Sequence, residues 1–349
     1  MLTPRPAIAR MKPYHPPLEG RRDFLRLDFN ENSRGCSPRV VEALRTIDAH
    51  EIATYPEYNA FKSKLAAFAG LPEENILPTN ASDEGIQTVF QTFLDPGSEV
   101  VLPVPTFAMF RFYAEILDLP VREVLYNTDL SFPETGVLSA ITERTRAVVL
   151  VNPNNPTGTA IQRNAIFRIL DVMKDRLVLL DEAYVEFHGE TLVDQINAYP
   201  NLVILRTFSK SFGLAGLRLG LVLSHAGNIG YMTKAHSPYS ISGLTVRLGM
   251  AALDDTASVR DYAFEISRSK ERLAAALKAM GVRSWPSSAN FLLAYFGDRS
   301  RAVEAALKAR GILVRDRSAD PLLQGCLRIT LGTLAQTERL IQALKETGG

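Results

Sequence analysis

The sequence has few of the features that mark secreted, metal-binding or membrane proteins. Its two cysteines, Cys36 and Cys326, form neither a metal-binding pattern nor a disulfide framework, and they suit a reducing compartment. The roughly eighteen consecutive apolar residues that a membrane-spanning helix needs occur nowhere. Pro4, Arg5 and Pro6 stand where a signal peptide would need an apolar core. We therefore expect a cytoplasmic protein without a metal site.

The chain also has no large excess of positive or negative charge. The formal net charge is +1, so the composition gives no reason to expect a nucleic-acid or membrane partner. The hydrophobic fraction of 46% is ordinary for a globular protein. At 349 residues the chain is too long for one small core, and two domains are expected.

Periodicity divides the chain into three parts. Residues 1–30 are rich in proline and are predicted to form an arm that packs with the small domain. Residues 31–250 alternate helical patterns with short apolar runs, which predicts an α/β domain with a mostly parallel sheet and flanking helices. Residues 251–349 begin with a long helical pattern and continue with strands near 290–295, 312–314 and 326–330. This last part is predicted to be a smaller α+β domain.

Lys210 follows an apolar run at residues 202–206 and therefore lies at the carboxyl end of a predicted strand. Ligands of open α/β sheets bind at that end. Ser209 and Ser211 flank the lysine, and Arg218 follows eight positions later. An amine on a rigid element beside hydroxyls and a guanidinium can hold a phosphorylated aldehyde.

Two further apolar runs end in polar residues. Residues 177–180 lead into Asp181, and residues 147–151 lead into the turn that contains Asn155. Three strand ends thus deliver a lysine, a carboxylate and an amide to one edge of a sheet. Pyridoxal phosphate requires these groups: a lysine for the Schiff base, a carboxylate for the ring nitrogen, and neutral donors for the ring oxygen.

In this order and spacing, Asn-Asn-Pro-Thr-Gly, Asp-Glu-Ala-Tyr and Ser-Lys resemble the motifs of fold-type I pyridoxal-phosphate aminotransferases. Within that class the chain most resembles the histidinol-phosphate aminotransferases, from Met11-Lys-Pro-Tyr14 to Arg328-Ile-Thr-Leu-Gly-Thr333. The resemblance implies an aspartate-aminotransferase-like large domain and a covalent aldimine at Lys210. It also implies transfer of the amino group of histidinol phosphate to 2-oxoglutarate, which gives imidazole acetol phosphate and glutamate in histidine biosynthesis.

A phosphate cradle is expected before the helical pattern at residues 85–93. Ser82 is a candidate N-cap, and free backbone N–H groups at a helix start bind anions. We expect the side chains of Asp83 and Glu84 to point away, since they would repel a phosphate. The family commonly has glycine where Ala81 stands. Ser209 and Arg218 are expected to complete the cradle.

The resemblance implies further cofactor contacts. Phe107 corresponds to an aromatic residue, more often tyrosine, that stacks on the cofactor ring. Tyr184 would donate to the ring oxygen beside Asn155. Tyr55 corresponds to a tyrosine that reaches the phosphate in the neighbouring subunit, although Thr54 stands where the family usually has arginine. A homodimer with shared active sites is therefore expected.

Arginines are the expected substrate ligands, because a guanidinium binds a carboxylate through two parallel hydrogen bonds. Arg328 is the candidate for the α-carboxylate, with an exposed edge charge as the alternative. By resemblance, Arg315 lies near the substrate phosphate, but a surface ion pair with Asp316 is the alternative. Tyr14 and Asn30 correspond to residues that line the entrance.

The expected partners are small molecules, an amino donor and a 2-oxo acid. Two other functions stay open, because the catalytic residues do not separate them. One is an aromatic amino-acid aminotransferase of the phenylalanine type. The other is a pyridoxal-phosphate lyase similar to threonine-phosphate decarboxylases, which would cleave the bond to the carboxylate.

Overall fold

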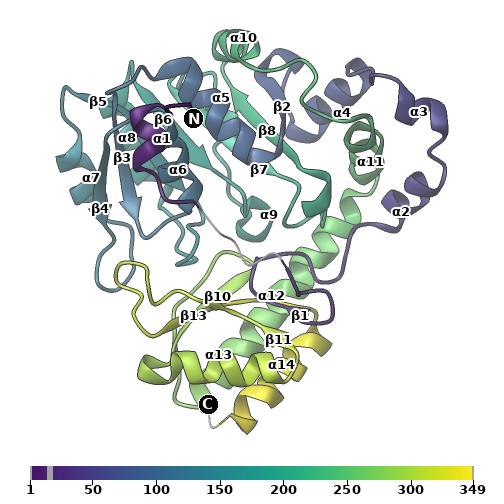
Figure 1. Cartoon of the computed structure of the whole chain (residues 1–349), viewed down its shortest axis with the longest axis vertical. Helices are drawn as coiled ribbons and strands as arrows, with labels where there is room; N and C mark the ends of the chain where they lie inside the picture. Colours follow the sequence, from purple (N-terminus) through teal and green to yellow (C-terminus); the bar gives the residue numbers. More distant parts are fainter. Residues whose placement is uncertain (1, 14–18, 348–349) are drawn as a thin grey trace.

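A seven-stranded, mostly parallel sheet forms the centre of the larger part of the molecule (Figure 1). The computed structural model describes residues 2–13 and 19–347. The strand order is β2-β8-β7-β6-β5-β3-β4, and only β8 runs antiparallel to its neighbours. The strands are β2 (Ile76–Asn80), β3 (Glu99–Val104), β4 (Val121–Leu125), β5 (Thr145–Val151), β6 (Leu177–Asp181), β7 (Leu202–Thr207) and β8 (Leu219–Ser224).

Alternate residues of the central strands enter two different cores, because successive side chains of a strand point to opposite faces of the sheet. Val148 and Leu150 belong to one hydrophobic cluster, and Ala147 and Val149 belong to the other. Strands buried on both faces explain why β5, β6 and β7 are nearly continuous apolar runs in the sequence.

Helices cover both faces of this sheet. The first core receives side chains from α2 (Pro38–Arg45), α4 (Asn59–Ala69), α7 (Glu134–Ala140), α8 (Arg163–Met173) and α11 (Gly243–Leu253). The second receives side chains from α5 (Ala81–Phe93), α6 (Ala108–Ile116) and α10 (Ala226–Ala235). The short helices α3 (Ala49–Ala53) and α9 (Val185–His188) complete this part.

A smaller antiparallel sheet has its own core. Its order is β12-β13-β10-β9, formed by β12 (Arg315–Asp316), β13 (Cys326–Thr330), β10 (Phe291–Tyr295) and β9 (Arg283–Ser284). Side chains of α12 (Thr256–Ala279), α13 (Ser300–Ala309) and α14 (Leu334–Glu346) pack with this sheet in a separate cluster. The α/β fold class with a smaller α+β part is confirmed.

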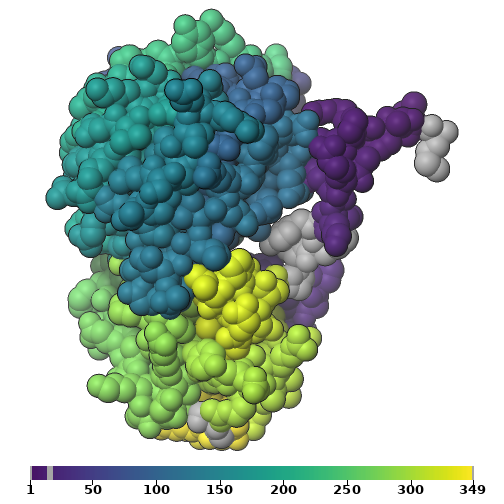
Figure 2. All heavy atoms as spheres, turned by 90° about the vertical axis from the view of Figure 1, so that its left-hand side faces the viewer, coloured from purple at the N-terminus to yellow at the C-terminus, as the bar shows by residue number. Residues whose placement is uncertain are grey.

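The first thirty residues contact both parts. Helix α1 (Pro6–Arg10) packs on α6 of the larger part, where Arg10 and Asp118 form an exposed ion pair. In Figure 2 this purple segment projects from the side of the molecule. Further on, β1 (Leu25–Arg26) pairs in parallel with β11 (Ile312–Leu313), and Leu27 is buried in the smaller core. Among the described residues, no helix has the length and apolar character needed to cross a bilayer.

Candidate active site

The carboxyl ends of β5, β6 and β7 lie at one edge of the large sheet, and each is followed by a predicted site residue. Val151 is paired with Asp181, and Asp181 with Leu205, so the strand ends are in register. Asn155, Asp181 and Lys210 line one cavity of about 680 Å³. The strand-end argument thus places these residues together correctly.

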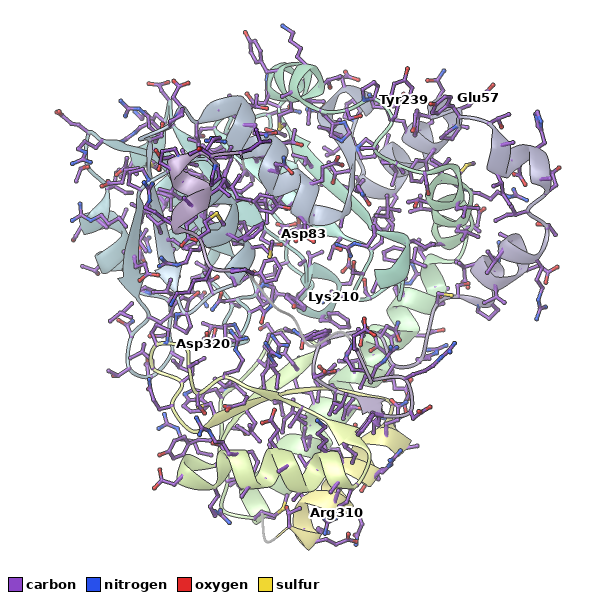
Figure 3. All side chains as sticks on the ribbon, in the orientation of Figure 1. Glu57, Asp83, Lys210, Tyr239, Arg310 and Asp320 are labelled. Atoms are coloured by element: carbon purple, nitrogen blue, oxygen red, sulfur yellow. The ribbon has the colours of Figure 1, made fainter. Side chains whose placement is uncertain are left out.

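This cavity lies between the two parts of the molecule, with Lys210 near the centre of Figure 3. The larger part contributes the strand-end residues and the start of α5. The smaller part, with the segment that precedes it in sequence, contributes several arginines. The described lining includes Arg21, Phe29, Asn30, Glu31, Ala81, Ser82, Asp83, Phe107, Asn155, Asp181, Tyr184, Ser209, Lys210, Arg218, Arg315, Arg317 and Arg328.

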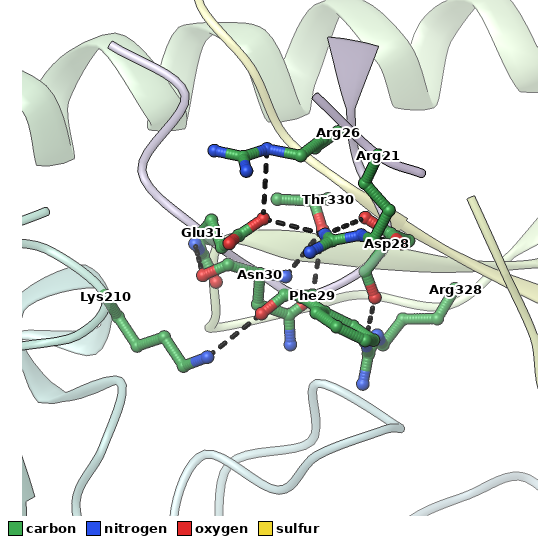
Figure 4. Close-up of polar contacts among 10 residues, drawn as sticks. Arg21, Arg26, Asp28, Phe29, Asn30, Glu31, Lys210, Arg328 and Thr330 are labelled. Carbon is green, nitrogen blue, oxygen red and sulfur yellow. Dashed lines mark hydrogen bonds and ion pairs between the residues drawn. The ribbon is translucent and has the colours of Figure 1, made fainter. Parts of the chain in front are cut away.

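Lys210 has a free side-chain amine in this cavity. Its Nζ donates a hydrogen bond to the backbone oxygen of Phe29 at 3.0 Å (Figure 4). Burial lowers the pKa of Lys210 to about 8, and the nearby Arg328 guanidinium acts in the same direction. A fraction of the amine is therefore unprotonated near neutral pH, as a nucleophile or a base requires.

Asp181 is a buried carboxylate with 4% of its surface exposed. Its Oδ1 accepts a hydrogen bond from the Ala183 N–H at 2.9 Å, and no described cation forms an ion pair with it. Burial raises the pKa of Asp181 to about 7. A buried acid without an ion-pair partner at a cavity wall fits a ligand with a protonated ring nitrogen, whose charge would stabilise the carboxylate.

Arg328 is also buried, so the alternative of an exposed edge charge is wrong. Its Nη1 donates to Asn155 Oδ1 at 2.6 Å, and its Nη2 donates to the backbone oxygen of Asp28. Its Nε has no hydrogen-bond partner among the described residues. Burial lowers the pKa of Arg328 to about 10. A buried cation that binds only neutral oxygens is ready to receive an anion.

Tyr184 and Asn30 form a second polar pair at the cavity. Asn30 has a left-handed backbone with φ of 55°, and its N–H donates to Thr330 Oγ1. Its Nδ2 donates to the Tyr184 hydroxyl at 2.9 Å. The hydroxyl accepts in this bond and keeps its own hydrogen available for a ligand. Burial raises the pKa of Tyr184 to about 12, so it stays protonated.

The start of α5 differs from the prediction. Asn80 occupies the N-cap position and Ser82 already lies inside the helix, so Ser82 as the N-cap is wrong. Ala81 has a φ of +64°, a conformation that favours glycine. At Gly220 of β8, an added Cβ would lie 2.5 Å from Ala81 C and Ser82 N. Close packing of β8 therefore leaves no room for a side chain at Gly220, and the positive φ of Ala81 is the reason that glycine suits position 81.

The prediction that the Asp83 side chain points away is wrong. Asp83 lines the cavity, and its Oδ2 lies 2.7 Å from Arg218 Nη2. The Arg218 charge is thus partly neutralised before any phosphate binds. Glu84 points elsewhere: its Oε2 accepts from Asn80 N and lies 3.0 Å from His236 Nε2. Of these two carboxylates, only Asp83 lines the cavity, where it contacts Arg218.

Ser209 and Phe107 lie where the sequence argument needs them. The Ser209 N–H donates to Thr207 Oγ1 at 3.1 Å, which fixes the turn after β7 and leaves the hydroxyl at the cavity. Phe107 immediately precedes α6 and contacts Phe110 edge-on at a centroid distance of 6.1 Å. Its ring is thereby held at the cavity wall.

Arg315 lines the cavity without an ion pair among the described residues, so the surface-pair alternative with Asp316 is wrong. It stands opposite Arg328 across the antiparallel pair of β12 and β13. Arg317 also lines the cavity and is paired with Asp320.

Sequence patterns gave no indication of several lining residues. Arg21 is buried and pairs with Asp28 at 2.7 Å and with Glu31 at 2.9 Å. Beneath the cavity, Arg206 pairs with the buried Glu182 at 3.0 Å. Arg21 and Glu31 are ten positions apart and share no helix or strand, so only the fold brings them together.

Among the predicted residues that the structure describes, Tyr55 does not line the cavity. Tyr55 is 80% exposed and packs on Tyr239 with ring centroids 5.0 Å apart, and Figure 3 shows Tyr239 in the upper part of the molecule, away from Lys210. Tyr14 lies outside the described residues. Within the described ranges no cluster of His, Cys, Asp or Glu fits a metal ion.

The residues present fit pyridoxal phosphate. A partly unprotonated amine, an unpaired buried carboxylate and a hydroxyl with a free hydrogen surround one end of the cavity. Backbone at the start of α5, together with Ser209 and Arg218, offers an anion site at the same cavity.

Comparison with known proteins agrees with this geometry. Residues 22–344 match the family described as aminotransferase class I and II. A histidinol-phosphate aminotransferase of Symbiobacterium thermophilum is 38% identical, over 100% of this chain and 99% of the relative. One of Roseiflexus castenholzii is 36% identical, over 98% and 97%. The crystal structure of histidinol-phosphate aminotransferase from Sinorhizobium meliloti with pyridoxal-5'-phosphate superimposes with a TM-score of 0.90 at 27% identity, covering 98% of this chain and 96% of that one.

Proposed function

The chain belongs to the class I and II aminotransferases and uses pyridoxal phosphate, and we propose that its amino donor is histidinol phosphate and its acceptor 2-oxoglutarate. The products would be imidazole acetol phosphate and glutamate, which places the enzyme in histidine biosynthesis. The names of full-length relatives, histidinol-phosphate aminotransferases, support histidinol phosphate as the donor.

The observation that carries the substrate proposal is the unpaired Arg315 beside Arg328. Histidinol phosphate has a phosphate and no carboxylate, whereas 2-oxoglutarate has two carboxylates. One cavity must therefore accept a phosphate dianion and carboxylates in turn. Two guanidiniums without carboxylate partners can bind either anion through paired hydrogen bonds.

We assign proton transfer to Lys210 and charge stabilisation to Asp181. When bound, pyridoxal phosphate withdraws electrons from the substrate carbon that carries the amine. Lys210 would hold the cofactor at rest, and its amine, once free, would remove the proton from that carbon and later return a proton. The Asp181 carboxylate keeps the ring nitrogen protonated. Asn155 and Tyr184 donate to the ring oxygen, and Phe107 packs on the ring face.

The phosphate of the cofactor is assigned to the start of α5 and its surroundings. The backbone at Ala81, Ser82 and Asp83 would supply N–H donors. The Ser209 hydroxyl and the Arg218 guanidinium would complete the cradle. Asp83 keeps Arg218 in place through their ion pair.

A homodimer with shared active sites is the proposed assembly. Several large apolar side chains are exposed on neighbouring elements of one side: Val41, Leu44, Ile52, Tyr55, Tyr239 and Leu244. Helix α11 contacts both α2 and α3 there. A second copy of the chain would cover this surface, and Tyr55 would then reach the cofactor phosphate of the partner subunit.

The division of the chain is proposed as an arm at 1–30, a cofactor-binding domain at 31–250 and a small domain at 251–349. The separate hydrophobic core around β10 and β13 supports this division. We propose that the enzyme works in the cytoplasm, where reduced cysteines are expected.

A substrate panel tests the function. The purified enzyme is given histidinol phosphate, phenylalanine or threonine phosphate, each with 2-oxoglutarate, and glutamate and carbon dioxide are measured. We expect the highest kcat/KM for glutamate formation with histidinol phosphate. A preference for phenylalanine would make the enzyme an aromatic aminotransferase, and carbon dioxide from threonine phosphate would make it a lyase.

A further inference from the structure

Phe29 provides an aromatic wall of the cavity that the cofactor contacts leave unused. The described lining contains the aromatic rings of Phe29, Phe107 and Tyr184. Phe107 and Tyr184 belong to the larger part of the molecule, on the side of Asp181. Phe29 belongs to the segment attached to the smaller part, on the side of Arg315.

The peptide bond that follows Phe29 is fixed at both of its polar atoms. Its carbonyl accepts the hydrogen bond from Lys210 Nζ at 3.0 Å. The next residue, Asn30, donates its N–H to Thr330 Oγ1 at 3.0 Å. Figure 4 shows Phe29 between these contacts. The main chain at Phe29 is therefore held beside the reactive amine, and the ring lines the same cavity.

Two arginines lie near the ring of Phe29, and only one of them is paired with carboxylates. The Arg21 guanidinium lies 4.0 Å from the ring centroid, and that of Arg315 lies 5.9 Å away. Arg21 is neutralised by Asp28 and Glu31, so it serves as a rigid platform. Arg315 has no such carboxylate. The Phe29 ring thus provides an apolar surface directly beside the unpaired guanidinium of Arg315.

We propose that Phe29 determines substrate specificity by receiving a planar ring of the amino donor against its face. This inference rests on the proposed function and adds the class of donor: a primary amine with an aromatic or heteroaromatic ring, favoured further by an anion beyond the ring. An offset contact between two rings is stronger than the contact of a ring with a branched aliphatic chain. The ring of the donor lies between Lys210 and Arg315.

Two substitutions separate a flat ring from simple apolar volume. Phe29→Leu removes the flat face, whereas Phe29→Tyr keeps it and is the matched control. For histidinol phosphate and phenylalanine, Phe29→Leu should lower kcat/KM about tenfold, mainly through KM. For glutamate, which has no ring, kcat/KM should change less than about twofold. Phe29→Met replaces Phe29→Leu if the leucine variant does not fold, since its flexible chain fills the space without a flat face.

Inhibition by unreactive acids gives a measurement that does not depend on turnover. Phenylpropionate has a ring and a carboxylate, and glutarate has carboxylates only. In Phe29→Leu the competitive inhibition constant of phenylpropionate should rise, while that of glutarate stays constant. Equal losses for ring and ringless ligands, or no loss for either, would overturn the role of Phe29.

The outcomes also separate this inference from the proposed function. If the natural enzyme prefers phenylalanine but Phe29→Leu selectively loses ring donors, the histidinol phosphate proposal fails and the role of Phe29 stands. If the natural enzyme prefers histidinol phosphate and Phe29→Leu retains it fully, the function stands and the role of Phe29 fails.

Discussion

Arg315 and Arg328 stand directly opposite each other on β12 and β13, and both line the same cavity. Like charges opposite each other across a strand pair destabilise a sheet. Burial lowers the pKa of Arg328, and the charges of Arg317 and Arg315 lower it further. A bound anion would relieve this repulsion, so this arginine pair favours the binding of anionic ligands.

Arg315→Ala should therefore weaken the use of histidinol phosphate. Loss of a hydrogen bond to a charged group costs about 1.5–3 kcal/mol, which corresponds to a fall in kcat/KM of about tenfold or more. Phenylalanine has no phosphate and should be hardly affected. The control is Arg310→Ala, at the far end of the molecule in Figure 3. An unchanged ratio of the two substrates would remove Arg315 from phosphate binding.

The second prediction compares two half-buried lysines. Burial lowers the pKa of Lys210 and of Lys270 to about 8. Only Lys210 reaches the cavity, since Lys270 Nζ donates to the backbone oxygen of Ser287. Lys210→Met should abolish transamination and Lys270→Met should retain it. After borohydride reduction, peptide mapping should find the cofactor on Lys210, and its presence on another lysine would refute the assignment.

The third prediction concerns Asp181 and pH. The folded carboxyl has a pKa of about 7 against an ordinary 3.8, so it holds its proton more tightly in the folded protein. Its contribution to stability is complete below about pH 3.8 and is lost as the pH rises through 7, by at most roughly 4 kcal/mol. Cofactor-free Asp181→Asn should therefore gain stability relative to the natural protein as the pH rises.

Urea unfolding at pH 5 and pH 8 measures this difference. The same substitution should lower kcat by several powers of ten in the cofactor-loaded enzyme, because the ring nitrogen loses its anionic partner. A stability difference independent of pH would show that Asp181 does not titrate in the folded protein.

Mixing inactive variants tests the shared active site. Lys210→Met and Tyr55→Ala should each be impaired alone. In a mixed dimer one site carries both changes and the other carries neither, so activity should return after subunit exchange. Verified exchange without recovered activity would place Tyr55 outside the partner subunit's site.

Ala81→Gly is expected to stabilise the protein by up to about 1 kcal/mol, because a left-handed backbone strains an L-residue and not glycine. In Ala305→Gly, at an exposed position of α13, the same change should cost about 1 kcal/mol. Thermal unfolding of both variants measures the contrast. Equal destabilisation by both would show that Ala81 is not strained.

Apolar runs predicted the central strands to within two residues, because β5, β6 and β7 are buried on both faces and leave no polar interruption. The sequence also predicted that Asn155, Asp181 and Lys210 share a cavity, since parallel strands end at one edge. Their positions directly after or at the ends of predicted strands were enough to predict that these three residues lie together.

Other features depend on packing that has no local pattern. Ser82 is not the N-cap because β8 sets the turn at Ala81 through Gly220. Asp83 turns toward the cavity because Arg218 arrives from a distant loop. Arg21 and Phe29 lie on either side of β1, which pairs with the distant β11, and no local pattern indicates their contact.

Because β8 runs opposite to its neighbours, two loops from different parts of the chain lie at the same edge of the sheet. Because β8 is antiparallel to both neighbours, Thr207 at the end of β7 and Asn80 at the end of β2 both lie beside its beginning. A single connection without a crossover helix carries Ser209, Lys210 and Arg218 along that edge. The same reversal brings the start of α5 to it. One strand of opposite direction thus lets two separated stretches of chain converge on one end of the cavity.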